Sequence, residues 1–246
     1  MKERIFFYSN HREDDFSIGI TKKVHAQIDE IKKVGFEVFF SAYYKGGIGV
    51  FDNNNEIVKF TPYLVRKGKL NHFIRRIQNL IFVGKYIENT DYEFKYVYMR
   101  FHYWDFFSKR LIKKIKNKKI ELVVEAHSYP YKKYNANILM RFFYQIDSVY
   151  SRNVHKYIDL VTAITDVKED IWGCKTIRIE NGVNLLDNEL RNSRCTEHDE
   201  LRLVCVANET ISHGIDRLLY GLKNYYKVNQ DKEVLVWMIG EYSKKN

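Results

Sequence analysis

The chain has 246 residues, of which 45% are hydrophobic and two are proline, a composition typical of a folded protein with one large or two modest domains. Its three cysteines form no CxxC pair, which argues against a disulfide framework or a cysteine zinc site and favours a reducing compartment. No apolar stretch approaches the ~20 residues of a membrane-spanning helix, and the N-terminus lacks the apolar run of a secretory signal. We therefore expect a cytoplasmic protein, free or peripheral at the inner face of the cell membrane.

The net charge of +10 is concentrated in two segments that contain no acidic residue, 66–85 and 109–119. Clusters of this kind attract anionic lipid surfaces, nucleic acid or phosphorylated ligands. A solvated helix face explains them equally well.

The first elements in the chain predict a βαβ unit. An apolar strand over 5–9 is followed by a polar loop and by a helix over about 20–34, in which apolar residues recur at three- and four-residue spacing. Gly35 ends this helix and residues 36–42 form a second strand. The crossover should be right-handed, with the first loop at the ligand edge of a parallel sheet. The turn-rich residues 43–55 predict a hairpin or loop excursion.

The remaining pattern alternates helices and strands, which predicts an α/β fold. We expect helices over 69–87, 105–116, 138–157 and 167–172, and strands over 96–100, at the start of the stretch 120–131, and over 160–165 and 176–180. Residues 186–200 are polar and irregular and predict a linker. A second strand–helix–strand unit follows over 201–207, 214–226 and 234–240. This unit is too small to cover both faces of a parallel sheet, so the second domain is expected to be incomplete.

The stretch IELVVEAHSYPY, residues 120–131, is the main candidate for a functional site in this sequence. Its β-branched run stops at polar and aromatic residues around a proline, a pattern typical of the carboxyl edge of a parallel sheet. Ligands of open α/β folds bind at that edge. We therefore expect Glu125 and His127 to form the floor of a site.

Five phrases in collinear order carry a resemblance to a known family. They are GITKKVHAQIDEIKKVGFEV, YVYMRF, VVEAHSYPYKK, RIENGVN and VANETISHGIDRLLYGL. Together they resemble bacterial retaining glycosyltransferases of the GT-B fold, of the family-4 type that assembles capsular polysaccharide and exopolysaccharide. The resemblance implies two Rossmann-like domains: residues 1–185 on the acceptor side and, after the linker, 201–246 as the first βαβ unit of the nucleotide-sugar side. The family's paired-glutamate motif and final helix do not occur before Asn246, so we expect a truncated form with little activity alone.

The resemblance and the positions of the residues assign roles in the first domain. His127 matches the family's active-site histidine, which contacts the transferred sugar, although a lone histidine is more often structural. Gly19 opens a helix whose backbone N–H groups can approach a phosphate or sugar, or it is a plain loop glycine. Arg100 and Glu125 each end a strand, where they pair with one another or bind acceptor hydroxyls. Tyr129 stacks on a sugar ring or packs in the core.

The second domain departs from the family pattern. Where the family has glycine, arginine and lysine to hold the diphosphate, this chain has Ala207, Asn208 and His213. Asparagine cannot supply the charge or the bidentate fork of arginine. His213 and the helix N-terminus at Gly214 offer only partial positive charge. The chain has no Asp-x-Asp motif, so we expect neither a metal nor another cofactor, with a nucleotide sugar as donor substrate.

These observations support two functions. The first is a glycosyltransferase-like protein that transfers a sugar from a nucleotide sugar to a saccharide or lipid-linked acceptor in cell-surface polysaccharide synthesis. The second is a non-catalytic relative that binds an acceptor, an anionic membrane surface or a partner glycosyltransferase chain. Whether the chain is an active enzyme stays open. A nucleic-acid partner is not expected, because charge and aromatic residues are unaccompanied by any recognised motif.

Overall fold

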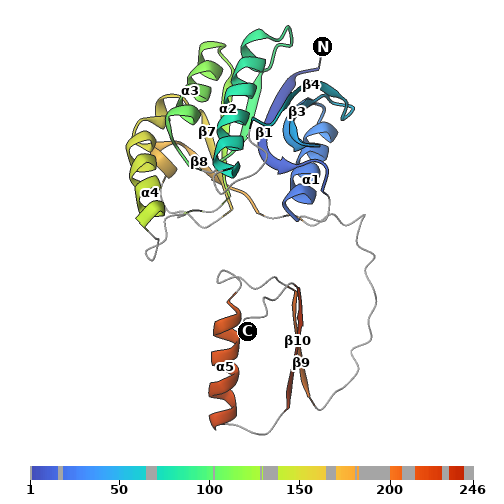
Figure 1. Cartoon of the computed structure of the whole chain (residues 1–246), viewed down its shortest axis with the longest axis vertical. Helices are drawn as coiled ribbons and strands as arrows, with labels where there is room; N and C mark the ends of the chain where they lie inside the picture. Colours follow the sequence, from blue (N-terminus) through green and yellow to red (C-terminus); the bar gives the residue numbers. More distant parts are fainter. Residues whose placement is uncertain are drawn as a thin grey trace. The chain divides into compact units, whose positions relative to one another are not determined.

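The computed structural model describes residues 2–15, 19–64, 71–101, 103–127, 129, 138–164, 170–180, 182, 200–206, 214–228 and 233–240. The chain divides into two compact units, Met1–Leu185 and Leu186–Asn246 (Figure 1). Each unit is described by itself.

Unit 1 is built on an eight-stranded mixed sheet in the order β4-β3-β2-β1-β5-β6-β7-β8. Its strands are β1 (Arg4–Arg12), β2 (Glu37–Tyr44), β3 (Gly47–Phe51), β4 (Ile57–Pro62), β5 (Tyr96–Arg100), β6 (Glu121–Ala126), β7 (Leu160–Ala163) and β8 (Thr176–Arg178). The strands from β2 through β1 to β8 are parallel, whereas β3 and β4 pair antiparallel. The α/β fold is therefore confirmed.

The helices of unit 1 connect successive strands of this sheet. They are α1 (Gly19–Lys33), α2 (Asn71–Asn89), α3 (Phe106–Asn117) and α4 (Ile138–Ser151), with short 3₁₀ turns η1 (Val154–Lys156) and η2 (Ile171–Gly173). The expected helix over 138–157 is wrong at its C-terminal end, because α4 stops at Ser151 and only one 3₁₀ turn continues. Gly35 follows α1 with φ +104, a conformation that glycine adopts without strain.

The expected excursion over 43–55 is a hairpin that extends the sheet beyond β2. A two-residue turn at Lys45 and Gly46, both with positive φ, leads from β2 into β3, and the chain then turns again into β4. Sequence periodicity does not predict β4, because five of its six residues are exposed and give no apolar alternation. The antiparallel pair forms one edge of the sheet, away from the parallel centre.

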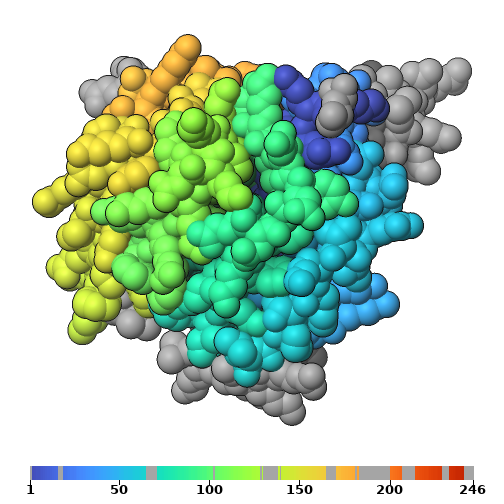
Figure 2. All heavy atoms as spheres, turned by 90° about the horizontal axis from the view of Figure 1, so that it is seen from above, coloured from blue at the N-terminus to red at the C-terminus, as the bar shows by residue number. Residues whose placement is uncertain are grey.

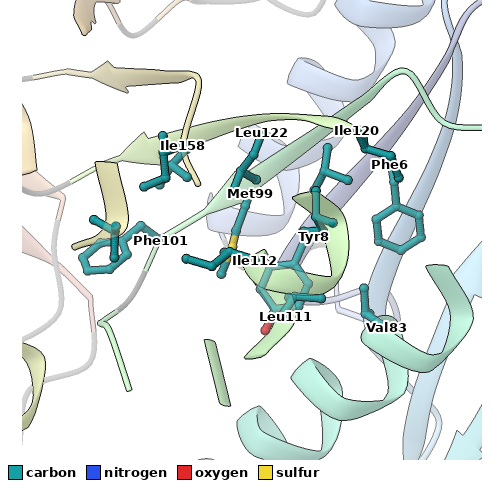
Figure 3. Close-up of a cluster of buried hydrophobic side chains, with 14 of the residues drawn as sticks. Phe6, Tyr8, Val83, Met99, Phe101, Leu111, Ile112, Ile120, Leu122 and Ile158 are labelled. Atoms are coloured by element: carbon teal, nitrogen blue, oxygen red, sulfur yellow. The ribbon is translucent and has the colours of Figure 1, made fainter. Parts of the chain in front are cut away.

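Alternate residues of β1 pack into two separate cores, one on each face of the sheet. Phe6 and Tyr8 lie with side chains of α2 and α3, whereas Phe7 lies with Val24 and Ile28 of α1. Since successive strand residues point to opposite faces, α1 covers one face and the pair α2 and α3 covers the other. Figure 3 shows the larger core, in which Leu111 and Ile112 of α3 meet the strand residues.

A buried ion pair fixes α2 against the start of α3. Arg76 Nη1 lies 2.5 Å from Asp105 Oδ2, Arg76 Nη2 donates to the Tyr103 carbonyl at 2.8 Å, and the guanidinium stacks on the Tyr103 ring. Asp105 is also the N-cap of α3, where its carboxylate accepts from Ser108 N and the Ser108 hydroxyl completes a capping box. Arg76 belongs to the first basic segment, yet this charge is internal and neutralised.

We expect Asp105→Ala to lower the free energy of unfolding by about 3–5 kcal/mol, since it removes the cap and leaves Arg76 buried without its counter-ion. Urea unfolding followed by tryptophan fluorescence reports it, because Trp104 is adjacent and buried. The control is Lys113→Ala, an exposed position on α3, which should stay within ~0.5 kcal/mol of the parent. A loss below ~1 kcal/mol for Asp105→Ala would contradict this reading of the pair.

Several other cations of the two basic segments lie on α2 and α3, which run side by side in Figure 2. Lys85, Arg110 and Lys113 are exposed, whereas Lys114 pairs with Glu88 at 2.5 Å and Lys116 with Asp159 at 2.7 Å. Within the described part of the chain, no helix has the length and apolar character needed to cross a membrane.

Unit 2 contains β9 (Leu201–Val206), α5 (Ile215–Val228) and β10 (Val234–Ile239), with the two strands parallel in register. This confirms the predicted strand–helix–strand order. None of the described α5 side chains is buried, and several large apolar side chains are exposed, including Val206, Tyr220 and Trp237. In the described part of unit 2, one helix cannot cover both faces of the two-stranded parallel sheet.

Candidate functional site

The strand order of the sheet reverses at β1, which pairs with β2 on one side and with β5 on the other. In open α/β sheets the crevice outside the carboxyl ends of such strands is the usual place for a ligand. In this chain, β1 ends in His11 and Arg12, β5 in Arg100, and β6 in Glu125 and Ala126. The polar residues predicted at the carboxyl edge are therefore gathered at the switch point.

Glu125 is the centre of a buried polar cluster. Its side chain is fully buried, with Arg100 Nε 3.3 Å and Lys23 Nζ 3.8 Å away, and it accepts hydrogen bonds of 3.1 Å from Gln27 Nε2 and from the Tyr98 hydroxyl. A carboxylate taken out of water needs such partners, because burying it unpaired is costly. The structure thus shows the pairing of Arg100 with Glu125. That either residue binds an acceptor stays a prediction.

Three buried polar atoms of this cluster lack a hydrogen bond from any described residue: Glu125 Oε1, Arg100 Nε and Gln27 Oε1. Buried polar groups in proteins are nearly always satisfied, by protein, water or ligand. The cluster therefore retains buried polar atoms whose hydrogen bonds no described residue supplies.

A cavity of about 1150 Å³ adjoins the cluster, on the face of the sheet that α1 covers. Lys23, Gln27 and Tyr98 line the cavity and also contact Glu125. Gly19 also lines the cavity, together with Ile179, Glu180 and Gly182, which follow β8. Residues of three phrases that carry the family resemblance, those that begin at Gly19, Tyr96 and Arg178, thus line a single cavity.

His127 follows β6 and is partly buried beside the cluster. Burial and the nearby positive charges of Arg100 and Lys23 lower its pKa, and only the Glu125 carboxylate acts in the opposite direction. The imidazole is therefore neutral near pH 7, where it exchanges hydrogen bonds instead of presenting a charge. Burial, with a contribution from Glu125, also raises the pKa of Tyr98, which keeps that hydroxyl a donor.

The other predicted site residues have simpler surroundings. Gly19 begins α1, and no described atom lies within 4 Å of the place that a Cβ would take, so packing alone does not require glycine. Tyr129 packs against the larger core, with its ring 6.2 Å from Trp172. Gly214 has φ +69 and its carbonyl accepts from Arg217 N and Leu218 N at the start of α5. Asn208 and His213 lie outside the described residues.

A second cluster at the same edge was not predicted from the sequence. Glu13 Oε2 lies 3.1 Å from His11 Nε2 and 2.8 Å from His25 Nε2, and the Ser9 hydroxyl lies 2.5 Å from His11 Nδ1. Burial lowers the pKa of His11; burial raises that of Glu13, but hydrogen bonds from both imidazoles reverse this and leave it lowered. The available signal was the polar run that directly follows the first apolar strand.

The comparisons with known proteins identify no family. No protein-family model and no curated protein matches the chain. Among solved structures, the chain is similar to a UDP-N-acetylglucosamine 2-epimerase, with 10% sequence identity and a TM-score of 0.46 over 99% of this chain and 70% of that one. At these values the functional argument rests on the site alone.

We expect the free energy of unfolding to fall between pH 7.5 and pH 5, because His11 and His127 both have lowered pKa values in the fold. Around and below its ordinary pKa near 6.5, each imidazole takes up protons more readily in the unfolded chain, so acid favours unfolding. His127→Gln should reduce this pH dependence, whereas the exposed control His155→Gln should preserve it. Urea unfolding at three pH values measures the slope, and an unchanged slope in His127→Gln would contradict the assignment.

Proposed function

We propose that this chain is a glycosyltransferase-like protein, and that unit 1 holds the saccharide part of an acceptor in the cavity beside Glu125. The reaction it serves is transfer of a sugar from a nucleotide-sugar donor to a saccharide or lipid-linked acceptor in cell-surface polysaccharide synthesis. The observation that carries the proposal is the buried Glu125 cluster, whose members Lys23, Gln27 and Tyr98 line a cavity shared by three phrases of the resemblance.

The charges around the cavity favour a neutral saccharide over a diphosphate. Among its described lining residues, Lys23 and Lys33 are cationic and Asp29, Glu30 and Glu180 are acidic, so these residues carry one net negative charge. Carboxylates accept hydrogen bonds from sugar hydroxyls, and Lys23 and Gln27 donate to them. A diphosphate would meet three carboxylates here, which disfavours this cavity as the nucleotide site.

In the proposed site, the Glu125 cluster mainly orients the side chains that meet the ligand and makes little direct contact with the ligand itself. Glu125 itself is completely buried, but it fixes the three cavity-lining side chains Lys23, Gln27 and Tyr98 through its two oxygens. Side chains held in this way present donors at fixed positions, which lowers the entropic cost of binding a polyhydroxylated ligand. To neutral His127, at the same edge, we assign hydrogen bonds with the sugar that is transferred.

We expect the chain to bind short oligosaccharides, and Lys23→Ala to weaken that binding at least about tenfold, because the variant removes a cavity-lining charge-assisted donor. The matched control is Lys22→Ala, one residue away on α1 but exposed and outside the cavity. Ligand-observed NMR on a panel of saccharides and nucleotide sugars gives the affinities. Assays of nucleotide release with the same panel test transfer itself.

Equal affinity in both variants would show that the ligand binds elsewhere. Binding of free nucleotide diphosphates in this cavity, displaced by no saccharide, would overturn the assignment to the acceptor. No binding of any saccharide or nucleotide sugar would overturn the proposed function.

The α2–α3 surface favours a second function, peripheral docking on an anionic membrane. Exposed Lys85, Arg110 and Lys113 lie on the same two helices as the exposed apolar side chains Ile81 and Phe106, a combination suited to lipid headgroups with shallow apolar insertion. We expect flotation with vesicles containing phosphatidylglycerol, and loss of flotation in a Lys85→Glu/Lys113→Glu variant. Absence of binding at moderate salt, or equal binding to neutral vesicles, would refute this docking.

A further inference from the structure

We propose that His11, Glu13 and His25 form a binding site for a divalent transition-metal ion, with Zn²⁺ the best chemical match. The three ligating atoms lie within 4.8 Å of one another, on the end of β1, the residue after it and the inner side of α1. This site is separate from the Glu125 cluster and does not depend on the proposed function.

The donor set and its spacing suit zinc. Two imidazole nitrogens and one carboxylate oxygen form a three-ligand set that leaves a fourth position open for water or substrate. With metal–ligand bonds of about 2.0–2.2 Å and tetrahedral angles, two ligand atoms on one zinc ion lie about 3.3 Å apart. The two distances from Glu13 Oε2 to the imidazole nitrogens, 3.1 and 2.8 Å, need only a small expansion to reach this value.

Ser9 provides the outer support that a metal-binding histidine needs. Its hydroxyl lies 2.5 Å from His11 Nδ1, so a proton on Nδ1 can be donated to Ser9 Oγ. That tautomer leaves the lone pair of His11 Nε2 directed toward Glu13. Metal-binding histidines typically donate their second ring N–H to an oxygen in this manner, which fixes the ring.

Hydrogen bonds to main-chain carbonyl groups of β1 and β2 hold the segments that carry the three ligands. Glu13 N donates to the Tyr43 carbonyl at 2.8 Å, which continues the pairing of β1 with β2. The Thr21 hydroxyl donates to the Arg12 carbonyl at 3.0 Å and thereby joins α1 to the end of β1. The Phe40 ring lies beside both imidazoles, at centroid distances of 6.0 and 5.9 Å. The ligands are therefore pre-organised in a partly apolar setting.

The charges around the three ligands and the access of solvent to them are consistent with the binding of a cation. Among the described residues, no lysine or arginine forms an ion pair with Glu13, whose two ion-pair partners are the imidazoles. Neighbouring Arg12 instead pairs with Asp14 and Asp15. The Glu13 and His25 side chains retain 11% and 16% exposure, which leaves an entry path from solvent.

The test is a titration of the whole chain, freed of metal by a chelator, with Zn²⁺ and with Co²⁺. We expect one ion per chain with a Kd of about 10 µM or tighter, and a visible Co²⁺ spectrum of low coordination number. The variants His11→Gln, Glu13→Gln and His25→Gln should each weaken binding at least about tenfold, and Ser9→Ala should weaken it by a similar factor through loss of its support. The exposed histidine variants His72→Gln and His155→Gln serve as controls and should bind as the parent does.

Far-UV circular dichroism shows which variants fold. The parent chain also decides the question without any substitution, because ¹H–¹⁵N spectra of the imidazoles identify the ring nitrogens that change on addition of Zn²⁺. Changes at His11 and His25 would support the site. Absence of stoichiometric binding, binding that persists in a folded His11→Gln/His25→Gln variant, or changes at other histidines only, would overturn it.

Discussion

A fully buried carboxylate constrains the centre of unit 1. Glu125 lies on β6 where a parallel strand is covered on both faces, and its charge is compensated by Arg100 of β5 and by side chains of α1. Loss of one member of a buried ion pair typically costs about 3–5 kcal/mol, because the remaining charge is left without a partner. The same contacts connect the carboxyl ends of two strands to α1, so the requirement to pair one charge also fixes the wall of the cavity.

The position of the cluster follows from the strand order. β1 pairs with β2 on one side and with β5 on the other. The helices that follow the adjacent parallel strands β1 and β5, α1 and α3, therefore cover opposite faces of the sheet. No helix can fill the crevice between them. Polar side chains at these strand ends therefore meet there: Glu125, Arg100 and His127 on one side, and His11 and Glu13 on the other. The two clusters are close enough for Arg100 to influence the pKa of His11.

Segments that are far apart in the sequence meet at the cavity. The phrases that begin at Gly19 and at Arg178 are separated by more than half of the chain, yet residues from both line the cavity. Their proximity is a property of the fold, since α1 and the segment after β8 flank the same face of the sheet. In the proposed function, the acidic side chains among its described lining residues favour a saccharide ligand over a diphosphate.

The sequence by itself determined the succession of helices and strands, because apolar periodicity reports which side of each element is buried. Strand Tyr96–Arg100 was predicted at its observed position, and the helix expected over 105–116 is observed over Phe106–Asn117. It also placed Arg100, Glu125 and His127 at strand ends, since a β-branched run that stops at polar residues marks the carboxyl edge. Exposed β4 gave no such signal.

Only the tertiary structure decided which polar residues act together. His25 reads as an ordinary helix residue, and its approach to His11 and Glu13 depends on how α1 packs across β1 and β2. Likewise, the sequence left open whether Arg100 and Glu125 pair, because the answer depends on the register of β5 against β6, which places the two residues opposite each other. Periodicity is a local property of the chain, whereas the convergence of charges from separate elements is set by packing.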